Sequence, residues 1–226
     1  MSHHIIQAFS LQGSDPIFTD SINCTADCSP LSFLLYARDH TPHFSTLVHS
    51  IMQWVWEYGM LGEMTREDAA LAADMALLHD AGKHLLPASI LEKADRLTPE
   101  EFHIVQKHPI WGEALLSCSL RERRDTSAFT YAIEICLHHH ERWDGAGYPD
   151  GLKGMEIPMY VQVVSLSDVY DALVAQRSYR PPMGHRSAAN LILSGGCGAF
   201  SPVLRSILAK RAQQIEALIY KEAPHE

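Results

Sequence analysis

Seven histidine and aspartate residues recur along the sequence at intervals of about one helix and one loop. They are His43, His79, Asp80, His108, His139, His140 and Asp168. The steps between them, with each adjacent pair taken as one position, are 36, 29, 31 and 28 residues. Imidazole and carboxylate groups are common transition-metal ligands, whereas a single histidine is more often a solvated or packed side chain. The prediction of a metal centre therefore rests on the whole set.

Five imidazoles and two carboxylates suit two octahedral ions better than one tetrahedral zinc. Adjacent helical residues diverge by about 100°, so His79 and Asp80 are expected to serve different metals, or Asp80 to bridge two. Two ions roughly 3.5–4 Å apart hold a bridging water whose lowered pKa provides hydroxide at neutral pH. Such a centre can activate a water molecule for hydrolysis.

The stretches around these residues have the apolar period of helices. Thr65 and Thr98 each begin a capping box, and strand patterning is nearly absent, so we predict an all-α fold. His79, His108 and His139 are expected at helix ends, which places one or two candidate ligands on each helix, as helical bundles do. The predicted helices span residues 43–58, 65–78, 98–108, 126–140, 158–176, 185–193 and 202–221.

The composition is that of a folded domain with an acidic surface. Hydrophobic residues make up 46% and charged residues 20% of 226 residues, and the formal net charge is −9. These values exclude a disordered or fibrous chain and disfavour binding to long nucleic acid, although metals or an arginine cluster can still create a local site for a small anion. We assign residues 1–30, which lack a sustained period, to an extension or lid of unknown role, and residues 31–226 to one domain.

Neither a leader nor a membrane span is evident. The first residues lack a basic start and an apolar core, and the uncharged run 187–204 is interrupted by glycine and proline. The five cysteines form neither a four-thiolate zinc motif nor an even framework. We therefore expect a reduced, cytoplasmic protein with free thiols that does not bind a membrane.

Six ordered motifs resemble the HD-GYP domain, a branch of the HD hydrolase superfamily. They are HDAGK at 79–83, PASILEK at 87–93, LTPEE at 97–101, HPIWG at 108–112, HHERWDGAGYP at 139–149 and SDVYDAL at 167–173. The resemblance runs from about residue 39 to residue 202. It implies a helical bundle around a two- or three-metal centre, with iron or manganese most often, and cleavage of a cyclic dinucleotide, usually cyclic di-GMP.

The resemblance also implies a role for individual residues. It makes the seven residues of the series metal ligands, with Asp80 bridging, and selects His139 and His140 rather than His138. Asp39 stands where members with three metals have glutamate; its side chain is one methylene shorter, so we favour two ions and leave a third open.

The substrate side of the site follows in the same way. Lys83, four residues after His79 and so on the same helical face, is expected to steady the phosphate in catalysis. Arg177 and Arg180 are expected to bind phosphate, although Ser178 replaces the family's usual proline. Tyr148, in the Gly-Tyr-Pro loop, is assigned to substrate binding.

We thus predict a metal-dependent phosphodiesterase that hydrolyses cyclic di-GMP to the linear dinucleotide, GMP or both through a metal-bridging hydroxide. Two alternatives stay open: a cyclic GMP-AMP phosphodiesterase, and a non-catalytic module that docks on GGDEF-domain partners through the loop Gly147–Pro149. The complete ligand set and Lys83 favour the enzyme. A general nucleotide phosphohydrolase would leave the Gly-Tyr-Pro loop unexplained, and a homodimer is left open.

Overall fold

A computed structural model describes residues 43–175 and 181–220 of the chain. These residues form helices, turns and loops, and they contain no strand beyond an isolated bridge between Gly196 and Gly198. The predicted all-α class is confirmed. The α-helices are α3 (Phe44–Glu57), α4 (Arg66–Met75), α5 (Ala88–Leu91), α6 (Pro99–Val105), α7 (His108–Ser119), α8 (Ser127–His138), α9 (Met159–Val174), α10 (His185–Leu193) and α11 (Pro202–Tyr220), and short 3-10 turns are η2 (Ala76–Leu78), η3 (Ala81–Leu85), η4 (Arg121–Arg123) and η5 (Gly154–Glu156).

The predicted helix boundaries hold where the sequence carries a local signal. Helix α10 has the predicted bounds, and α3, α8, α9 and α11 lie within the predicted ranges. Both capping boxes are present: Thr65 accepts from the backbone N–H of Asp68, and Thr98 from that of Glu101. Each threonine satisfies an N–H group that has no partner inside its helix. These helix starts could therefore be predicted from local sequence alone.

Helix α7 corrects the predicted place of His108. The sequence prediction has His108 at the end of a helix, but α6 already ends at Val105 and His108 is the first residue of α7. Pro109 is tolerated because it lies in the first turn, where N–H groups lack helical partners anyway. No helix was predicted over residues 109–119, a segment that holds Pro109 and Gly112, and proline and glycine usually disfavour helices.

Gly82 and Gly112 are both needed because three segments pack very closely beside the site. A Cβ atom on Gly82 of η3 would lie 1.9 Å from the carbonyl oxygen of His108 and 2.5 Å from the backbone nitrogen of Gly112. A Cβ atom on Gly112 would lie 2.5 Å from Sγ of Cys136 in α8. Only glycine permits such contacts. The two glycines thus let η3, α7 and α8 meet directly behind the candidate ligands.

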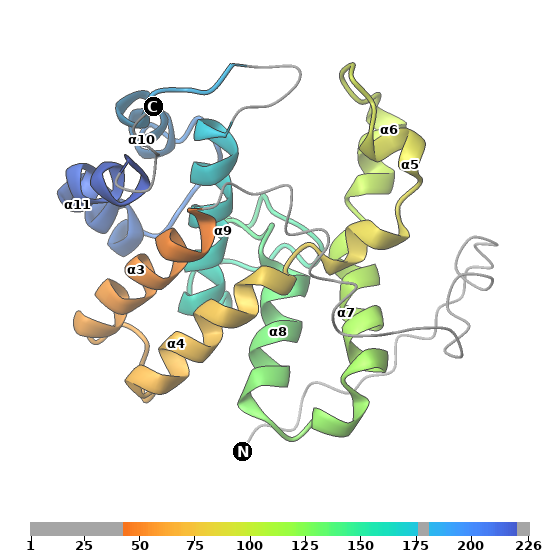
Figure 1. Ribbon diagram of the computed structural model, residues 1–226, viewed down its shortest axis with the longest axis horizontal. Coiled ribbons are helices and arrows are strands. Elements are labelled where there is room, and N and C mark those ends of the chain that lie inside the picture. The colour runs from red at the N-terminus through yellow and green to blue at the C-terminus, as the bar shows by residue number, and fades with distance from the viewer. Residues whose placement is uncertain (1–42, 176–180, 221–226) are drawn as a thin grey trace.

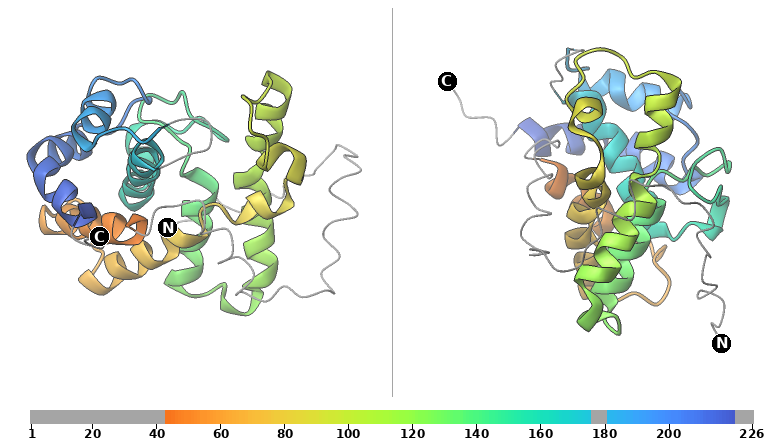
Figure 2. Two further views of the ribbon diagram at one scale, coloured as in Figure 1. Left: turned by 45° about the horizontal axis from the view of Figure 1, so that its top comes forward. Right: turned by 90° about the vertical axis from the view of Figure 1, so that its right-hand side faces the viewer.

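Helix α9 is the central element of the fold. Its side chains are buried around most of its circumference, and it packs against α3, α4, α8 and α10 (Figures 1 and 2). Helix α11 covers α3 and α10, whereas α5 and α6 lie at the opposite end of the molecule, beyond α7 (Figures 1 and 2). Asp168 is therefore carried by the most enclosed helix, whose position is set by contacts on several sides.

Two further sequence expectations can be examined in the described part of the chain. No helix there is long and apolar enough to cross a membrane. Cys136 is a buried free thiol and Cys197 a partly buried one. Cys118 is disulfide-bonded, so the expectation of free thiols is wrong at that position.

Candidate metal centre

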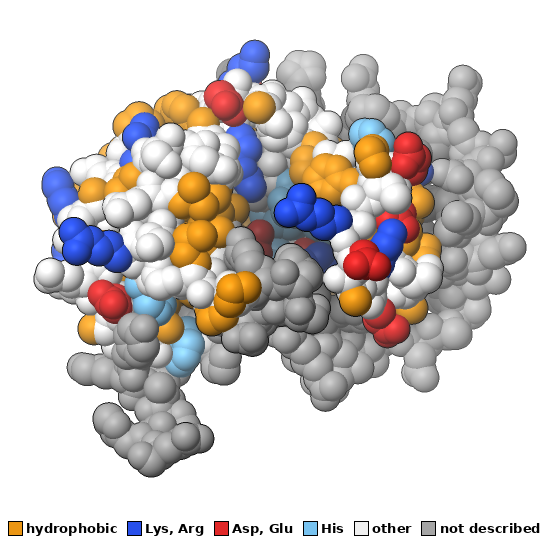
Figure 3. Space-filling view, turned by 90° about the horizontal axis from the view of Figure 1, so that it is seen from above, with side chains coloured by type: hydrophobic (Ala, Val, Ile, Leu, Met, Phe, Trp, Pro, Cys, Tyr) orange, Lys and Arg blue, Asp and Glu red, His pale blue; other side chains and the backbone are white. Residues whose placement is uncertain are grey.

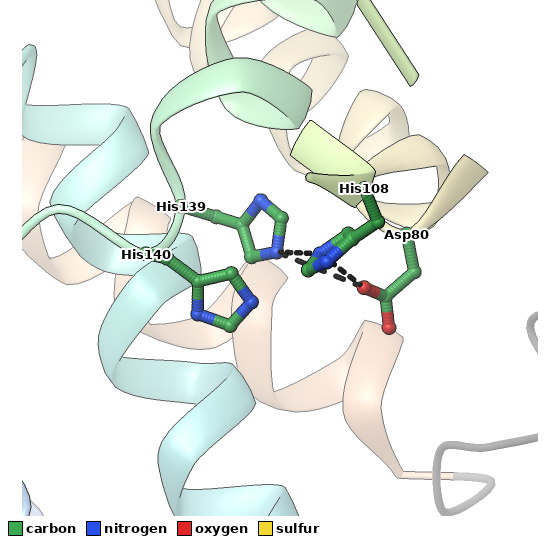
Figure 4. Close-up of side chains that lie close together, drawn as sticks. All are labelled: Asp80, His108, His139 and His140. Carbon is green, nitrogen blue, oxygen red and sulfur yellow. Dashed lines mark hydrogen bonds and ion pairs between the residues drawn. The ribbon is translucent and has the colours of Figure 1, made fainter. Parts of the chain in front are cut away.

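The carboxylate of Asp80 lies at the centre of a group of histidines from separate parts of the chain. Asp80 precedes η3, His108 begins α7, and His139 and His140 follow α8. One ligand atom from each of the four residues lies within 4.8 Å of all the others (Figure 4). Oδ1 of Asp80 is 3.2 Å from Nε2 of His108 and 3.7 Å from Nε2 of His139. Asp80, His108 and His139 are almost fully buried.

Three histidine rings in this region are oriented in the same way. Each ring donates its Nδ1–H to a backbone carbonyl three residues earlier. The pairs are His79 with Ala76 at 2.6 Å, His108 with Val105 at 2.7 Å and His139 with Cys136 at 2.9 Å. A neutral imidazole has only one N–H, so the Nε2 atom of each ring carries a lone pair. Metal-binding histidines are typically fixed by such a bond from the other ring nitrogen.

The lone pairs of two of these rings point at each other. Nε2 of His108 and Nε2 of His139 are 3.3 Å apart, and the Asp80 carboxylate beside them is also an acceptor. Burial lowers the pKa of His139 to about 4, so a second proton on that ring is disfavoured at neutral pH. Acceptors that converge in a buried space repel one another unless a cation lies between them. Two nitrogens and a carboxylate oxygen suit a transition-metal ion.

The other oxygen of Asp80 faces Lys83 and His79. Lys83 Nζ lies 2.6 Å from Oδ2, and His79 Nε2 lies 3.3 Å from it. Burial raises the pKa of the Asp80 carboxyl, but the charge of Lys83 opposes it, and the pKa is held well below its usual range. His79 Nε2 is also 3.9 Å from Oδ1 of Asp168 on α9. Asp80 therefore has one oxygen toward each side of the cluster, as a bridging carboxylate requires.

The backbone around Asp80 differs from the expected continuous helix. Asp80 (φ −97°, ψ 12°) separates η2 from η3, so Lys83 does not share a helical face with His79. The turn instead brings the ammonium group onto the carboxylate three residues earlier. Lys83 therefore lies at the site because it pairs with Asp80, and not because it shares a helix with His79.

The remaining ligand candidates are not part of the group of four, and three of the expected site residues lie outside the described residues. His43 is the N-cap of α3. Burial lowers the pKa of His185, and the nearby His43 makes a smaller contribution in the same direction. The group of four does not include His43, His79 or Asp168. Asp39, Arg177 and Arg180, together with residues 1–30, fall outside the described residues.

Tyr148 lies against a ligand candidate. Its ring stacks on that of His140 with a centroid distance of 4.7 Å and an interplanar angle of 24°. Its backbone N–H donates to the carbonyl of His140 at 3.3 Å. Burial lowers the pKa of His140 well below its usual value and raises the pKa of Tyr148. The loop thus returns to cover the turn that carries the paired histidines.

Two charged residues next to the histidines were not assigned a role from the sequence. Glu141 is 2% exposed, and its carboxylate accepts the backbone N–H groups of residues 150–152. Arg142 donates to the carbonyls of His139 and Glu141 and to the hydroxyl of Ser165 on α9. The sequence did contain an indication of their role. Charged residues that lie between two candidate ligands and a glycine-rich loop are buried with the turn, and buried charges need partners.

One face of the molecule has a recess with both acidic and basic side chains (Figure 3). Figure 3 shows a recess with histidine and acidic side chains at its floor and lysine or arginine side chains on either side. Although the whole chain carries a net charge of −9, positive charge gathered beside a metal centre can attract a phosphate locally.

The fold and site together define an all-helical domain with a histidine–aspartate cluster that could hold a metal ion. In a comparison with known protein families, the family described as "HD domain" matches residues 35–196 of this chain. The chain therefore belongs to the HD domain family. Its resemblance to HD-GYP proteins, seen in the motifs, is confirmed.

Several curated relatives are similar over much of the chain. A "Probable cyclic di-GMP phosphodiesterase" of Vibrio cholerae is 43% identical over 130 residues, which are 57% of this chain and 30% of the relative. A "Cyclic di-GMP phosphodiesterase" of Thermotoga maritima is 39% identical over 65% of this chain and 39% of the relative. The "3'3'-cGAMP-specific phosphodiesterase 1" of Vibrio cholerae is 30% identical over 100% of this chain and 52% of the relative. The chain spans about a third of the length of the first two relatives.

Solved structures support the fold. An HD-GYP-type protein, Bd1817 from Bdellovibrio bacteriovorus, superposes with a TM-score of 0.52 at 21% identity, covering 78% of this chain and 51% of that one. A cyclic GMP-AMP phosphodiesterase of Vibrio cholerae gives a TM-score of 0.50 at 18% identity, covering 84% of this chain and 50% of that one. At these identities the likeness concerns the fold alone.

Proposed function

We propose that this chain is a metal-dependent phosphodiesterase that hydrolyses a cyclic dinucleotide, cyclic di-GMP, to the linear dinucleotide, GMP or both. The observation that carries the proposal is the convergence of histidine Nε2 lone pairs on the buried carboxylate of Asp80. The relatives named as cyclic di-GMP phosphodiesterases support the choice of substrate, since they are 39–43% identical to this chain over 57–65% of its length.

The ions would be held by His43, His79, Asp80, His108, His139, His140 and Asp168, with iron or manganese as the metals we propose and Asp39 as the candidate for a third ion. Bound metals would supply charge neutralisation and an activated water. The chain's own groups then position the substrate. Lys83, held 2.6 Å from Asp80, places an ammonium group where negative charge builds up on phosphate oxygens. Arg177 and Arg180 are proposed to bind phosphate, because guanidinium forms paired hydrogen bonds with it.

A second substrate, cyclic GMP-AMP, is favoured by one observation. A relative that is matched along the entire chain is named as specific for 3'3'-cGAMP, whereas two cyclic di-GMP relatives match 57% and 59% of the chain. The two substrates differ in one base. Product formation from each, measured under the same conditions, decides between them.

The proposal also covers a partner protein, the oligomeric state and the location in the cell. A GGDEF-domain protein is proposed to dock on the loop Gly147–Pro149, whose three residues are each partly exposed. A non-catalytic module of this kind would bind the partner without turnover. A homodimer and a cytoplasmic location remain predictions from the sequence.

The deciding experiment joins metal content to product formation. Protein purified without oxygen should contain at least two transition-metal ions per chain and convert cyclic di-GMP to a product separable by chromatography. The double variant His79→Ala, Asp80→Ala should lose both metal and activity, because it removes the carboxylate at the centre and one of its histidines. A His138→Ala variant is the matched control, since His138 instead contacts Asp150 at 3.0 Å. Full metal occupancy in the double variant would refute the assignment.

A further inference from the structure

Glu141 is a buried carboxylate that organises the loop after the paired histidines. Its Oε1 accepts the backbone N–H of Asp150 at 2.7 Å and of Gly151 at 3.0 Å, and its Oε2 accepts that of Leu152 at 3.1 Å. Three consecutive amides therefore depend on one side chain nine residues or more away in sequence. Hydrogen bonds to a charged acceptor in a buried place are among the stronger ones.

The start of the same loop is fixed by a different residue. Arg142 holds the carbonyls of His139 and Glu141 and is anchored to α9 through Ser165, at 2.7 Å. Its guanidinium also lies over the ring of Phe200, 5.4 Å from the centroid. The turn at residues 139–142 is therefore rigid, and Glu141 links its rigid backbone to the returning segment at residues 150–152.

The segment between these two anchors carries Tyr148. Gly147 passes so close to the turn that a Cβ atom would lie 2.4 Å from Cα of Glu141 and 2.5 Å from the carbonyl oxygen of His140. The Tyr148 ring then stacks on the His140 ring at 4.7 Å. Among the described hydrogen bonds, His140 has no ring bond of the kind that orients His79, His108 and His139. The His140 ring also contacts the rings of His139 and His108, with centroids 4.1 and 5.0 Å away, and both are themselves ligand candidates. Tyr148 is the ring that the loop places against it.

We infer that Glu141 is a positioning residue of the metal centre: by binding the amides of residues 150–152 it holds Tyr148 against His140 and so orients that ring toward the metal. The inference rests on the metal centre of the proposed function, and it adds a residue that neither binds metal nor touches substrate. Contacts that orient a ligand typically change metal affinity by about 10–100-fold.

The test uses Mn²⁺ alone as the probe and does not depend on turnover. Glu141→Gln keeps the shape of the side chain but turns one acceptor into an amide donor, which then faces an N–H group. The amides of residues 150–152 should exchange with deuterium at least about tenfold faster, and the Mn²⁺ dissociation constant should rise about 10–100-fold. Glu156→Gln is the matched control: Glu156 is exposed, and its carboxylate caps η5 through the single amide of Lys153, at 2.8 Å. It should change neither quantity.

A second variant separates positioning from general stability. Tyr148→Leu removes the stacked ring and leaves Glu141 in place, so Mn²⁺ affinity should fall while the amides of residues 150–152 stay protected. If Glu141→Gln loosens the loop but binds Mn²⁺ like the wild type, the positioning role is refuted, and unchanged amide exchange would refute the clamp itself. A wild-type protein that binds no Mn²⁺ would overturn the metal centre and with it the positioning role, while amide exchange would still show whether Glu141 holds the loop.

Discussion

The very close packing of Gly82 against α7 leads to a strong prediction for Gly82→Ala. The added Cβ would lie 1.9 Å from the carbonyl oxygen of His108, 2.5 Å from the nitrogen of Gly112 and 2.8 Å from the carbonyl carbon of His108. Carbon atoms of this kind do not come within 3.0 Å of a neighbour, so η3 and α7 would have to separate by at least 3.0 − 1.9 = 1.1 Å. All three contacts are backbone atoms, which cannot rotate away as a side chain would.

A shift of that size would reach the site directly. His108 begins α7, and its Nε2 lies 3.2 Å from Asp80, which immediately precedes η3. Metal–ligand distances are defined to about 0.2 Å, so a displacement of about 1 Å between the two ligands is incompatible with joint coordination. We expect Gly82→Ala to lower the free energy of unfolding by about 1–3 kcal/mol or more, the usual cost of overpacking, and to weaken Mn²⁺ binding strongly.

The assay is urea unfolding of metal-free protein, followed by Mn²⁺ titration of the folded protein. Gly184→Ala is the matched control, because Gly184 has an ordinary φ of −62° and a Cβ atom added there would meet no atom within 4 Å. It should change stability and affinity little. If Gly82→Ala were as stable as Gly184→Ala and bound Mn²⁺ normally, the close contact of η3 with α7 would not exist in solution.

Three further predictions concern the site. Burial lowers the pKa of His139 from 6.5 to about 4, so as pH falls the unfolded chain takes up a proton that the folded chain refuses, and stability is lost between those values. Between pH 7.5 and 5, the free energy of unfolding of the metal-free wild type, measured in urea, should therefore fall by about 2 kcal/mol more than that of His139→Asn. Lys83→Ala should leave metal content near normal and lower kcat at least about tenfold, because its interaction grows in the transition state. Arg177→Ala or Arg180→Ala should raise KM for the cyclic dinucleotide about tenfold or more without changing metal content.

Each of these has a control of the same residue type. His138→Asn, next to His139, should follow the wild-type pH profile, and identical profiles for all three proteins would contradict the role of burial. Lys93→Ala removes a lysine that pairs with Glu101 at 2.6 Å, and an equal fall in kcat for it and Lys83→Ala would remove Lys83 from the mechanism. Arg186→Ala, at an exposed position of α10, is the control for the two arginine variants. If neither Arg177→Ala nor Arg180→Ala changed KM, these arginines would not bind the phosphate.

The sequence predicts well whatever depends on neighbours along the chain. The capping boxes at Thr65 and Thr98 and the apolar stripes of α3 and α10 are local features, and those helices form where the pattern places them. Helix α7 was missed because Gly112 is there for a contact with η3 and α8 that no local pattern encodes. Hydrogen bonds of Glu141 and the stacking of Tyr148 on His140 likewise join residues whose approach depends on the folded loop.

The same division applies to the candidate ligands, and it has a physical reason. The prediction that histidines lie at helix ends came from helices read from apolar periods and capping signals, and the structure explains why ends are suitable. The last carbonyls of a helix have no partner within it, so they can accept the Nδ1–H of a histidine three residues later. His108 and His139 use such carbonyls, from α6 and α8, whereas the Ala76 carbonyl of η2 accepts both the backbone N–H and the Nδ1–H of His79. In each case the bond from Nδ1 selects the tautomer and aims Nε2 inward. A histidine in mid-helix would find that carbonyl already bonded, so the helix ends themselves prepare this donor set for a metal.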